Sequence, residues 1–220
     1  MPDLLKQEIL QKTERHIRQL LEGEGSGHDW WHIHRVRNTA LQLAKEENAD
    51  LFIVELAALL HDIADHKFHD GDETIGPKVA AEWLRSIYTD EDTIQNIQQI
   101  IKDISFKGAG VETPMHSLEG EIVQDADRLD AIGAIGIGRA FAYGGHKNRE
   151  MYNPEVSPTQ HSSFEAYKSD KGPTINHFYE KLFLLKDRMN TKAARKMAEE
   201  RHRFMQEYVE RFYSEWDGKK

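Results

Sequence analysis

The spacing of the apolar residues constrains this chain more than any other feature. They recur mainly three or four positions apart with charged residues between them, which is the pattern of amphipathic helices. No segment alternates apolar and polar residues, as a half-buried strand does, for more than a few positions. The sequence therefore predicts an all-α fold, with helices at about 4–21, 30–44, 50–62, 78–89, 92–104, 116–129, 131–142, 174–188 and 191–216.

Length and composition indicate one domain with a substantial core. The chain has 220 residues, which is enough to bury a core without disulfides. It contains no cysteine, so thiol nucleophiles and cysteine-ligated zinc are excluded, and His, Asp and Glu are the available metal ligands. The 29 Lys and Arg residues against 38 Asp and Glu give a net charge of −9, which argues against general nucleic-acid binding. We expect a single-domain helical bundle over residues 1–220 and leave a homodimer open.

The sequence offers no segment for membrane insertion or secretion. The longest apolar stretch, Leu51–Leu60, has ten residues, includes Glu55 and is too short to cross a bilayer. Charged residues such as Lys6 and Glu8 interrupt the N-terminal segment, which lacks the uncharged core of a secretory signal. We therefore expect a soluble, cytoplasmic protein that does not bind membranes.

One long segment, about 143–173, interrupts the helical pattern. A continuous helix is unlikely there because the segment holds several glycines and prolines, namely Gly144, Gly145, Pro154, Pro158, Gly172 and Pro173. Connections of this length are often functional, so a lid or substrate-facing loop and a plain surface segment are both left open. The core of the predicted site is then about 26–142, with the helices at 174–216 packed on it.

An ionisable pair, His61-Asp62, directly follows the apolar run Leu56–Leu60. Because an unpaired charge beside a buried segment is costly, this pair needs partners. The two side chains are near enough around a helix to share one ion, and Asp65 falls on the same face. The pattern favours a functional site, although a solvated helix end with a histidine present by chance would have the same sequence.

The preceding predicted helix holds a second candidate ligand, His32. His28, His32 and Arg35 are spaced by four and three residues and share a face, whereas His34 lies about 200° from His32. His32 is favoured over His28 because it lies inside the helix, where packing fixes its side chain. Taken alone, such a histidine pair beside tryptophans is also compatible with ordinary packing.

A third cluster consists of Asp125, Asp127, Arg128 and Asp130. Asp125 and Asp127 are about 200° apart on a helix, so the two cannot easily bind the same ion, whereas Asp127 and Asp130 share a face. The alternative interpretation is helix capping together with an ion pair to Arg128.

Four stretches carry a family resemblance. They are H-D-W-W-H-I-H-R-V (28–36), H-D-I-A-D-H-K-F (61–68), D-A-D-R-L-D-A-I-G (125–133) and N-H-F-Y-E-K-L (176–182). With these motifs the chain resembles the HD-domain phosphohydrolases, metal-dependent all-α enzymes, and in particular their small stand-alone bacterial branch of the YpgQ/YedJ type. The resemblance implies that His32, His61, Asp62 and Asp127 bind the metal.

These four side chains are suited to binding one divalent cation. Two imidazoles and two carboxylates suit Mn²⁺, which we favour, as well as Mg²⁺, Fe²⁺, Co²⁺ or Zn²⁺. Four protein ligands on an octahedral ion leave two positions for a water and a phosphate oxygen. Asp65, one helical turn away, is the candidate general base or acid. The candidate cations for the developing phosphate charge are Lys67, Arg35, Arg128 and Lys107. Further substrate contacts are expected from His146, Lys147 and Arg149 if the 143–173 segment covers the pocket.

The resemblance implies hydrolysis of phosphoanhydride or phosphoester bonds in nucleotides, with cleavage of (deoxy)nucleoside triphosphates to monophosphate and pyrophosphate favoured. Hydrolysis of a cyclic nucleotide or of guanosine tetraphosphate stays open, because the same ion chemistry serves any phosphate ester. A metal-bound nucleotide sensor with little turnover is an alternative of another class. In a further alternative the protein is a scaffold and the three polar clusters are ordinary helix ends. This interpretation requires all three clusters to occur by chance.

Overall fold

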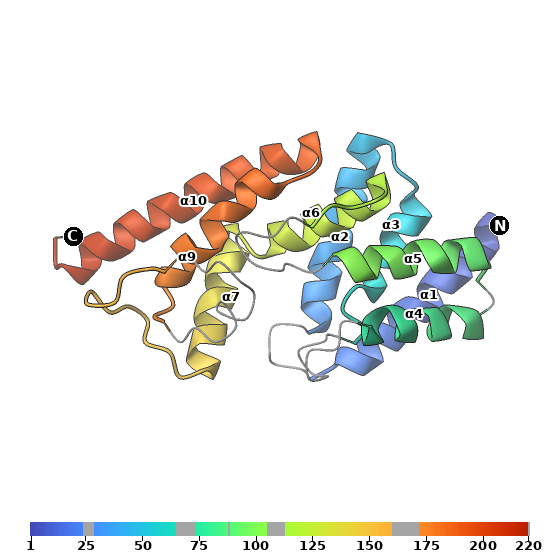
Figure 1. Ribbon diagram of the computed structural model, residues 1–220, viewed down its shortest axis with the longest axis horizontal. Helices are drawn as coiled ribbons and strands as arrows, with labels where there is room; N and C mark the ends of the chain where they lie inside the picture. The colour runs from blue at the N-terminus through green and yellow to red at the C-terminus, as the bar shows by residue number, and fades with distance from the viewer. Residues whose placement is uncertain (24–28, 65–73, 88, 105–112, 160–171, 220) are drawn as a thin grey trace. The chain divides into compact units, whose positions relative to one another are not determined.

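The structure is a computed structural model that describes residues 1–23, 29–64, 74–87, 89–104, 113–159 and 172–219 (Figure 1). All regular secondary structure in these residues is helical, so the predicted all-α class is confirmed. Contacts divide the chain into two compact units, Met1–Phe106 with Thr113–Ala126 and Lys107–Glu112 with Asp127–Lys220. The division falls within one helix, α6 (Leu118–Asp130). Among the described residues, no helix combines the length and the apolar character that a membrane span needs.

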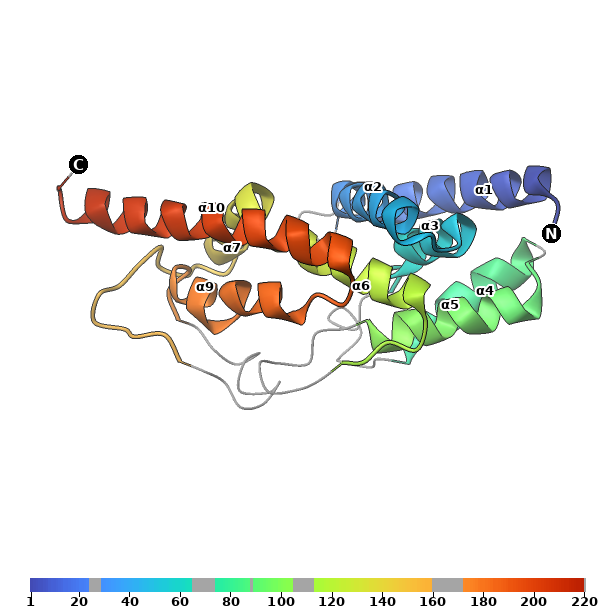
Figure 2. The same cartoon turned by 90° about the horizontal axis from the view of Figure 1, so that it is seen from above.

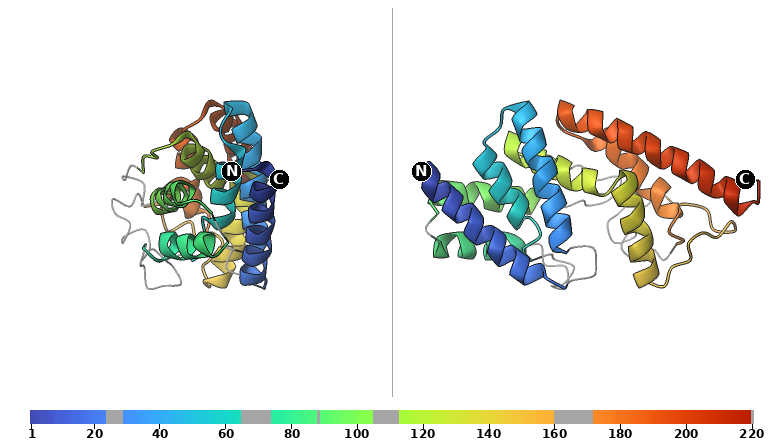
Figure 3. Two further views of the ribbon diagram at one scale, coloured as in Figure 1. Left: turned by 90° about the vertical axis from the view of Figure 1, so that its right-hand side faces the viewer. Right: turned by 180° about the vertical axis from the view of Figure 1, so that it is seen from behind.

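The first unit is built around α3 (Leu51–Leu60). This helix packs against α1 (Asp3–Leu21), α2 (Trp30–Glu47) and α5 (Glu91–Asp103), and the first three helices lie side by side (Figure 3). Residues 56–60 are fully buried, in keeping with the uninterrupted apolar sequence of the C-terminal half of α3. The residue that follows α3, His61, is therefore attached to the most buried helix of the unit.

Aspartate caps fix the starts of α2 and α3. The backbone N–H of His32 donates to Asp29 Oδ1 at 2.8 Å, and those of Phe52 and Ile53 donate to Asp50 Oδ1 at 2.8 and 3.3 Å. Each carboxylate satisfies N–H groups that have no partner within the helix. The predicted starts near Asp29 and Asp50 are thus confirmed.

A helical pair completes the first unit. Helix α4 (Ile75–Ser86) and α5 run side by side (Figures 1 and 2). The Trp83 indole N–H of α4 donates to Thr13 Oγ1 of α1 at 3.0 Å, which connects the pair to the rest of the unit. Helix α4 starts three residues before the predicted position 78 and ends three before 89, whereas α5 matches its prediction within one residue at each end.

The second unit contains α7 (Gly133–His146), α9 (Asn176–Glu180), the 3-10 helix η2 (Leu182–Arg188) and α10 (Lys192–Trp216). Helix α10 lies along α7 and η2 (Figure 2). Aromatic rings from α7, α9 and α10 pack together with centroids 6.2 to 6.4 Å apart, namely Phe141, Phe178, Tyr208 and Phe212. Such ring contacts add to the apolar burial that holds this unit together.

The predicted helix at 174–188 is wrong in its continuity. The backbone leaves helical geometry at Lys181 (φ −140°, ψ −56°), which separates α9 from η2. Leu182 and Leu185 are buried three residues apart, a spacing that fits a 3-10 helix as well as an α-helix, so apolar spacing alone could not distinguish the two. The break before α10 is confirmed, since Thr191 Oγ1 accepts a hydrogen bond from the Ala194 N–H at 3.3 Å.

The irregular segment predicted at 143–173 begins later than expected, because α7 continues to His146. A backbone hydrogen bond connects Glu150, near the start of this segment, to Thr174, just after it: the Thr174 N–H donates to the Glu150 carbonyl at 2.9 Å. Residues 160–171 lie outside the described residues. A lid role for this segment stays a prediction.

Candidate metal centre

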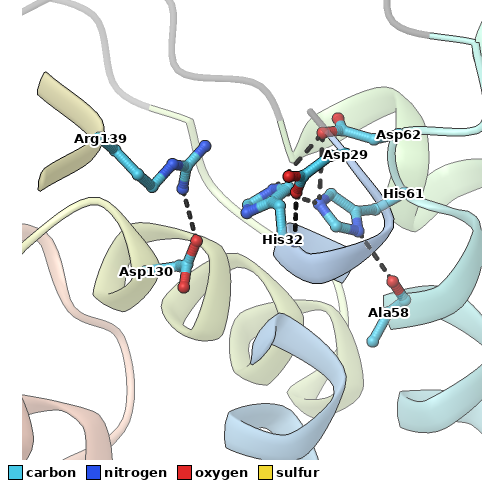
Figure 4. Close-up of polar contacts among 7 residues, drawn as sticks. All are labelled: Asp29, His32, Ala58, His61, Asp62, Asp130 and Arg139. Atoms are coloured by element: carbon cyan, nitrogen blue, oxygen red, sulfur yellow. Dashed lines mark hydrogen bonds and ion pairs between the residues drawn. The ribbon is translucent and has the colours of Figure 1, made fainter. Parts of the chain in front are cut away.

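His61, at the end of α3, presents one specific ring nitrogen for a metal. Its Nδ1 lies 2.8 Å from the carbonyl oxygen of Ala58, and because a carbonyl only accepts, Nδ1 carries the proton (Figure 4). The lone pair is therefore on Nε2. The hydrogen bond to Ala58 also fixes the ring orientation, as is usual for histidines that ligate metals.

His32, in the first turn of α2, faces His61. The two Nε2 atoms are 3.3 Å apart, and the rings meet edge to face with centroids 5.3 Å apart. Two nitrogens about 2.1 Å from one ion and separated by 90° to 109° would be about 3.0 to 3.4 Å apart. The observed separation fits a shared ion. Both histidines are buried, which keeps their side chains in place.

Asp62 contributes a carboxylate to the same place. Its Oδ2 lies 3.5 Å from His32 Nε2 and 3.7 Å from His61 Nε2 (Figure 4). These separations are slightly wider than those expected between two ligands of one ion. A carboxylate and two imidazole nitrogens that face one another offer lone pairs that a divalent cation would accept.

Asp127, on α6, belongs to the same group. One ligand atom each from His32, His61 and Asp127 lies within 4.8 Å of the others. Asp127 directly follows Ala126, the last residue of the first unit on that helix. Asp125 is fully buried and is not a member of this group among the described residues, in keeping with the opposed faces that the sequence predicts.

The chemistry of these donors fits a divalent metal. Neutral imidazole nitrogens and carboxylate oxygens are ligands that Mn²⁺, Fe²⁺, Co²⁺, Mg²⁺ and Zn²⁺ accept to different degrees. One ligand atom each of His32, His61 and Asp127 lies close enough to the others for the three to hold one metal ion, and Asp62 lies beside the two histidines. The ligand roles that the resemblance implies thus fall on side chains that lie together.

Four candidate residues lie outside the described part of the chain. They are Asp65, Lys67, Lys107 and His28, of which His28 is the less favoured partner of His32. Their roles stay predictions. Arg35 is half-buried on α2, one turn after His32, where its predicted role as a substrate contact is neither supported nor opposed by a described contact.

Arg128 has a structural partner. Its guanidinium is buried and donates a hydrogen bond to the carbonyl of Arg188, which follows α9 in the second unit. Asp130, another member of this cluster, pairs with Arg139, whose Nη1 lies 2.5 Å from Asp130 Oδ2. A role for Arg128 in binding substrate stays a prediction.

The basic residues at the end of α7 gather around one ring. Lys147 Nζ lies 5.6 Å and the Arg149 guanidinium carbon 5.8 Å from the centroid of Tyr143. His146 and Lys147 are exposed, and Arg149 is half-buried. All three remain candidate substrate contacts.

Sequence reasoning overlooked Arg139, which pairs with Asp130 at the end of α6 (Figure 4). The two are nine residues apart across a turn, so helical spacing could not connect them. The signal in the sequence was the small-residue turn Ala131-Ile132-Gly133, which allows the chain to fold back.

Comparison with known proteins identifies the family. The HD-domain family model matches residues 30–132, a range that contains all four predicted ligands. The protein YpgQ of Bacillus subtilis is 40% identical over 206 residues, covering 92% of this chain and 91% of that protein.

Two solved structures extend the similarity to the fold. A Bacillus thuringiensis protein described as an HD-superfamily hydrolase is 44% identical and covers 96% of this chain and 98% of its own, with a TM-score of 0.76. The structure of B. subtilis YpgQ in complex with ADP is 35% identical in its alignment and covers 96% of each chain, with a TM-score of 0.77. Since these similarities span nearly the whole sequence, the predicted all-α fold of the HD type is confirmed, and this chain belongs to the HD-domain family.

Proposed function

We propose that this protein is a metal-dependent phosphohydrolase that acts on nucleotides, cleaving (deoxy)nucleoside triphosphates to monophosphate and pyrophosphate. The observation that carries the proposal is that His32 Nε2, His61 Nε2 and Asp62 Oδ2 lie within 3.7 Å of one another, and that Asp127 is grouped with the two histidines. The ADP complex of YpgQ supports a nucleotide as substrate.

The protein's part in this reaction is to hold the ion and the substrate in fixed positions. Ala58 orients the His61 ring, and the Asp29 cap fixes the turn of α2 that carries His32. A divalent ion held there would lower the pKa of a water and withdraw charge from a phosphoryl oxygen. Asp65, four residues after His61 in the sequence, is the proposed general base.

Mn²⁺ is the proposed ion. Mg²⁺ prefers an all-oxygen environment, whereas this set has two nitrogen and two oxygen donors. The set also contains no thiolate, the ligand that selects zinc in many structural sites. Elemental analysis of protein purified without added metal would identify the resident ion.

The decisive experiment is a nucleotide panel with product identification. Purified protein is incubated with Mn²⁺ and nucleoside triphosphates, diphosphates, cyclic nucleotides or guanosine tetraphosphate, and products are separated by ion exchange. We expect monophosphate and pyrophosphate from a triphosphate. The Asp62→Asn variant should lose roughly 100-fold or more in kcat, since removal of a metal ligand is at least as damaging as removal of its supporting contacts.

Asp187→Asn is the matched control, because that carboxylate is 77% exposed and pairs only locally with Lys186 in the described contacts. It should retain wild-type activity. Absence of turnover with every nucleotide, or full activity in Asp62→Asn, would refute the proposed function. Stabilisation by nucleotide without any product would instead identify a metal-bound sensor.

A further inference from the structure

Gln124, on α6, is a fully buried amide that connects three parts of the first unit. Its Nε2 donates to the backbone carbonyl of Asp103, at the end of α5, at 3.4 Å, and to that of Thr113 at 3.1 Å. The Thr113 hydroxyl oxygen lies 3.4 Å from the same nitrogen. An amide NH₂ group has two hydrogens, so Gln124 can bond both carbonyls at once. This one side chain therefore attaches α6 to the end of α5 and to the segment that precedes α6.

Two further contacts hold the beginning of α6. Gly120 lies so close to α5 that a Cβ there would be 3.3 Å from Ile100 Cγ1. Glu119 Oε1 accepts a hydrogen bond at 3.2 Å from the backbone N–H of Asp50, the residue that caps α3. Helix α5 in turn packs against α3, which ends next to His61. The first turns of α6 are thus attached to the two helices on which one of the candidate ligands depends.

Gln124 lies one turn before Asp127, the candidate ligand of α6. Gly120, Gln124 and Asp127 are spaced by four and three residues, so they lie on one face of the helix. With a rise of 1.5 Å per residue, Asp127 is only about 4.5 Å farther along the helix axis. A ligand atom of Asp127 lies within 4.8 Å of those of His32 and His61. The bonds of Gln124 are therefore made close to the metal centre, on the face that supplies the carboxylate.

The position of Asp127 depends on how α6 is held. The two histidines are fixed by contacts of α2 and α3, whereas Asp127 comes from a third helix. A metal ion requires its ligands within about 0.2 Å of their preferred distances, so a small shift of α6 would remove the carboxylate from the ion. Gln124 opposes such a shift, because it would break the bonds from a fully buried amide to two carbonyls, which is costly.

We propose that Gln124 is a positioning residue for the metal centre. By fixing α6 to the end of α5, it holds Asp127 where the carboxylate and the two histidines can bind one ion. Gln124 acts through the helix and does not contact the ion. The inference goes beyond the proposed function, because it concerns metal affinity and is independent of the phosphate bond that is cleaved.

The test measures Mn²⁺ binding to metal-free protein by isothermal titration calorimetry. Gln124→Met keeps approximately the size of the side chain and removes both donor hydrogens. Its dissociation constant for Mn²⁺ should rise about 10-fold or more, the effect of losing contacts that support metal ligands. Circular dichroism shows whether each variant is folded. Gln124→Asn, which retains the amide on a shorter side chain, should weaken binding less than Gln124→Met but more than the controls, and it provides the result if Gln124→Met does not fold.

Two controls separate positioning from general stability. Gln99→Met makes the same chemical change on the exposed face of α5, where Gln99 donates to Asp103 Oδ2 at 2.5 Å, and it should bind Mn²⁺ like the wild type. Thr13→Val removes a buried hydrogen bond of the first unit, the one from the Trp83 indole. It should lower the melting temperature of the metal-free protein and leave the dissociation constant for Mn²⁺ unchanged.

Wild-type affinity in folded Gln124→Met would overturn this inference. An equal loss of affinity in Thr13→Val would also overturn it, because any loss of stability would then weaken metal binding. These measurements need no turnover. A wild type that binds Mn²⁺ but hydrolyses no nucleotide would therefore refute the proposed function alone, and the comparison of the variants would still decide the role of Gln124.

Discussion

Replacing Asp127 by asparagine tests the metal centre separately from catalysis. The substitution keeps the size and shape of the side chain, and Asp127 is only half-buried on α6. In the presence of a chelator, the free energy of unfolding should therefore change by no more than about 0.5 kcal/mol. A loss of stability relative to the wild type should appear only when metal is added. The Asp127 carboxylate, with an oxygen within 4.8 Å of ligand nitrogens of His32 and His61, is then replaced by an amide, which is a weaker ligand.

The size of the effect follows from linkage. An ion at 100 times its dissociation constant stabilises the native wild type by about 2.7 kcal/mol. For a chain of this length, that raises the melting temperature by about 5 to 11 °C. If the lost carboxylate lowers affinity about 100-fold, the same ion concentration gives Asp127→Asn only about 0.4 kcal/mol, or about 1 to 2 °C.

Differential scanning fluorimetry with and without Mn²⁺ measures this difference, and Asp217→Asn on the exposed C-terminal turn serves as the control. The control should shift like the wild type, since Asp217 pairs with Lys219 far along the sequence from any predicted ligand. A full metal-dependent shift in Asp127→Asn would show that Asp127 is not a ligand. No shift in the wild type, together with no stoichiometric ion, would refute the whole centre.

Two further predictions concern the framework of the fold. Gly133→Ala should lower the free energy of unfolding by about 1 to 3 kcal/mol, because φ is +75° and the new Cβ would lie 2.9 Å from Arg201 Cγ. Gly138→Ala, with nothing within 4 Å, should be neutral or stabilising by up to about 1 kcal/mol, and equal urea midpoints for the two variants would contradict this reasoning. His16 stacks on Trp83 with centroids 3.8 Å apart, and burial lowers its pKa from 6.5. The unfolded chain then binds the proton more readily, so stability is complete above about pH 6.5 and falls as the pH drops through the lower native pKa. His16→Phe should lose less stability than the wild type between about pH 7 and 5 in urea titrations, and identical slopes would contradict the assignment.

The parts of the site that could be predicted are those governed by local helix geometry. Asp29 and Asp50 were recognisable as caps, because each carboxylate precedes a helical apolar pattern and bonds within three residues. His61 was recognisable because it ends a run that must be buried. The separation of Asp125 from Asp127 around one helix also followed from the helical repeat.

The parts that could not be predicted depend on turns and on contacts between distant residues. The pairing of Asp130 with Arg139 requires the positive φ of Gly133, which nothing in the helical spacing reveals. The break at Lys181 has the same origin, because three-residue spacing is compatible with both types of helix. Local pattern thus identified candidate ligands, and only tertiary structure identified the neighbouring arginine.

The described ligands are held by contacts that form when the helices fold, rather than by the metal alone. His61 is fixed by its bond to Ala58 on the most buried helix, and the turn that carries His32 is fixed by Asp29. The two Nε2 atoms lie 3.3 Å apart, so a metal ion would not have to order two free side chains. We expect this preorganisation to raise metal affinity without any additional ligand. It also means that a substitution in α3 that loosens its packing should weaken metal binding, even though the substituted residue never contacts the ion.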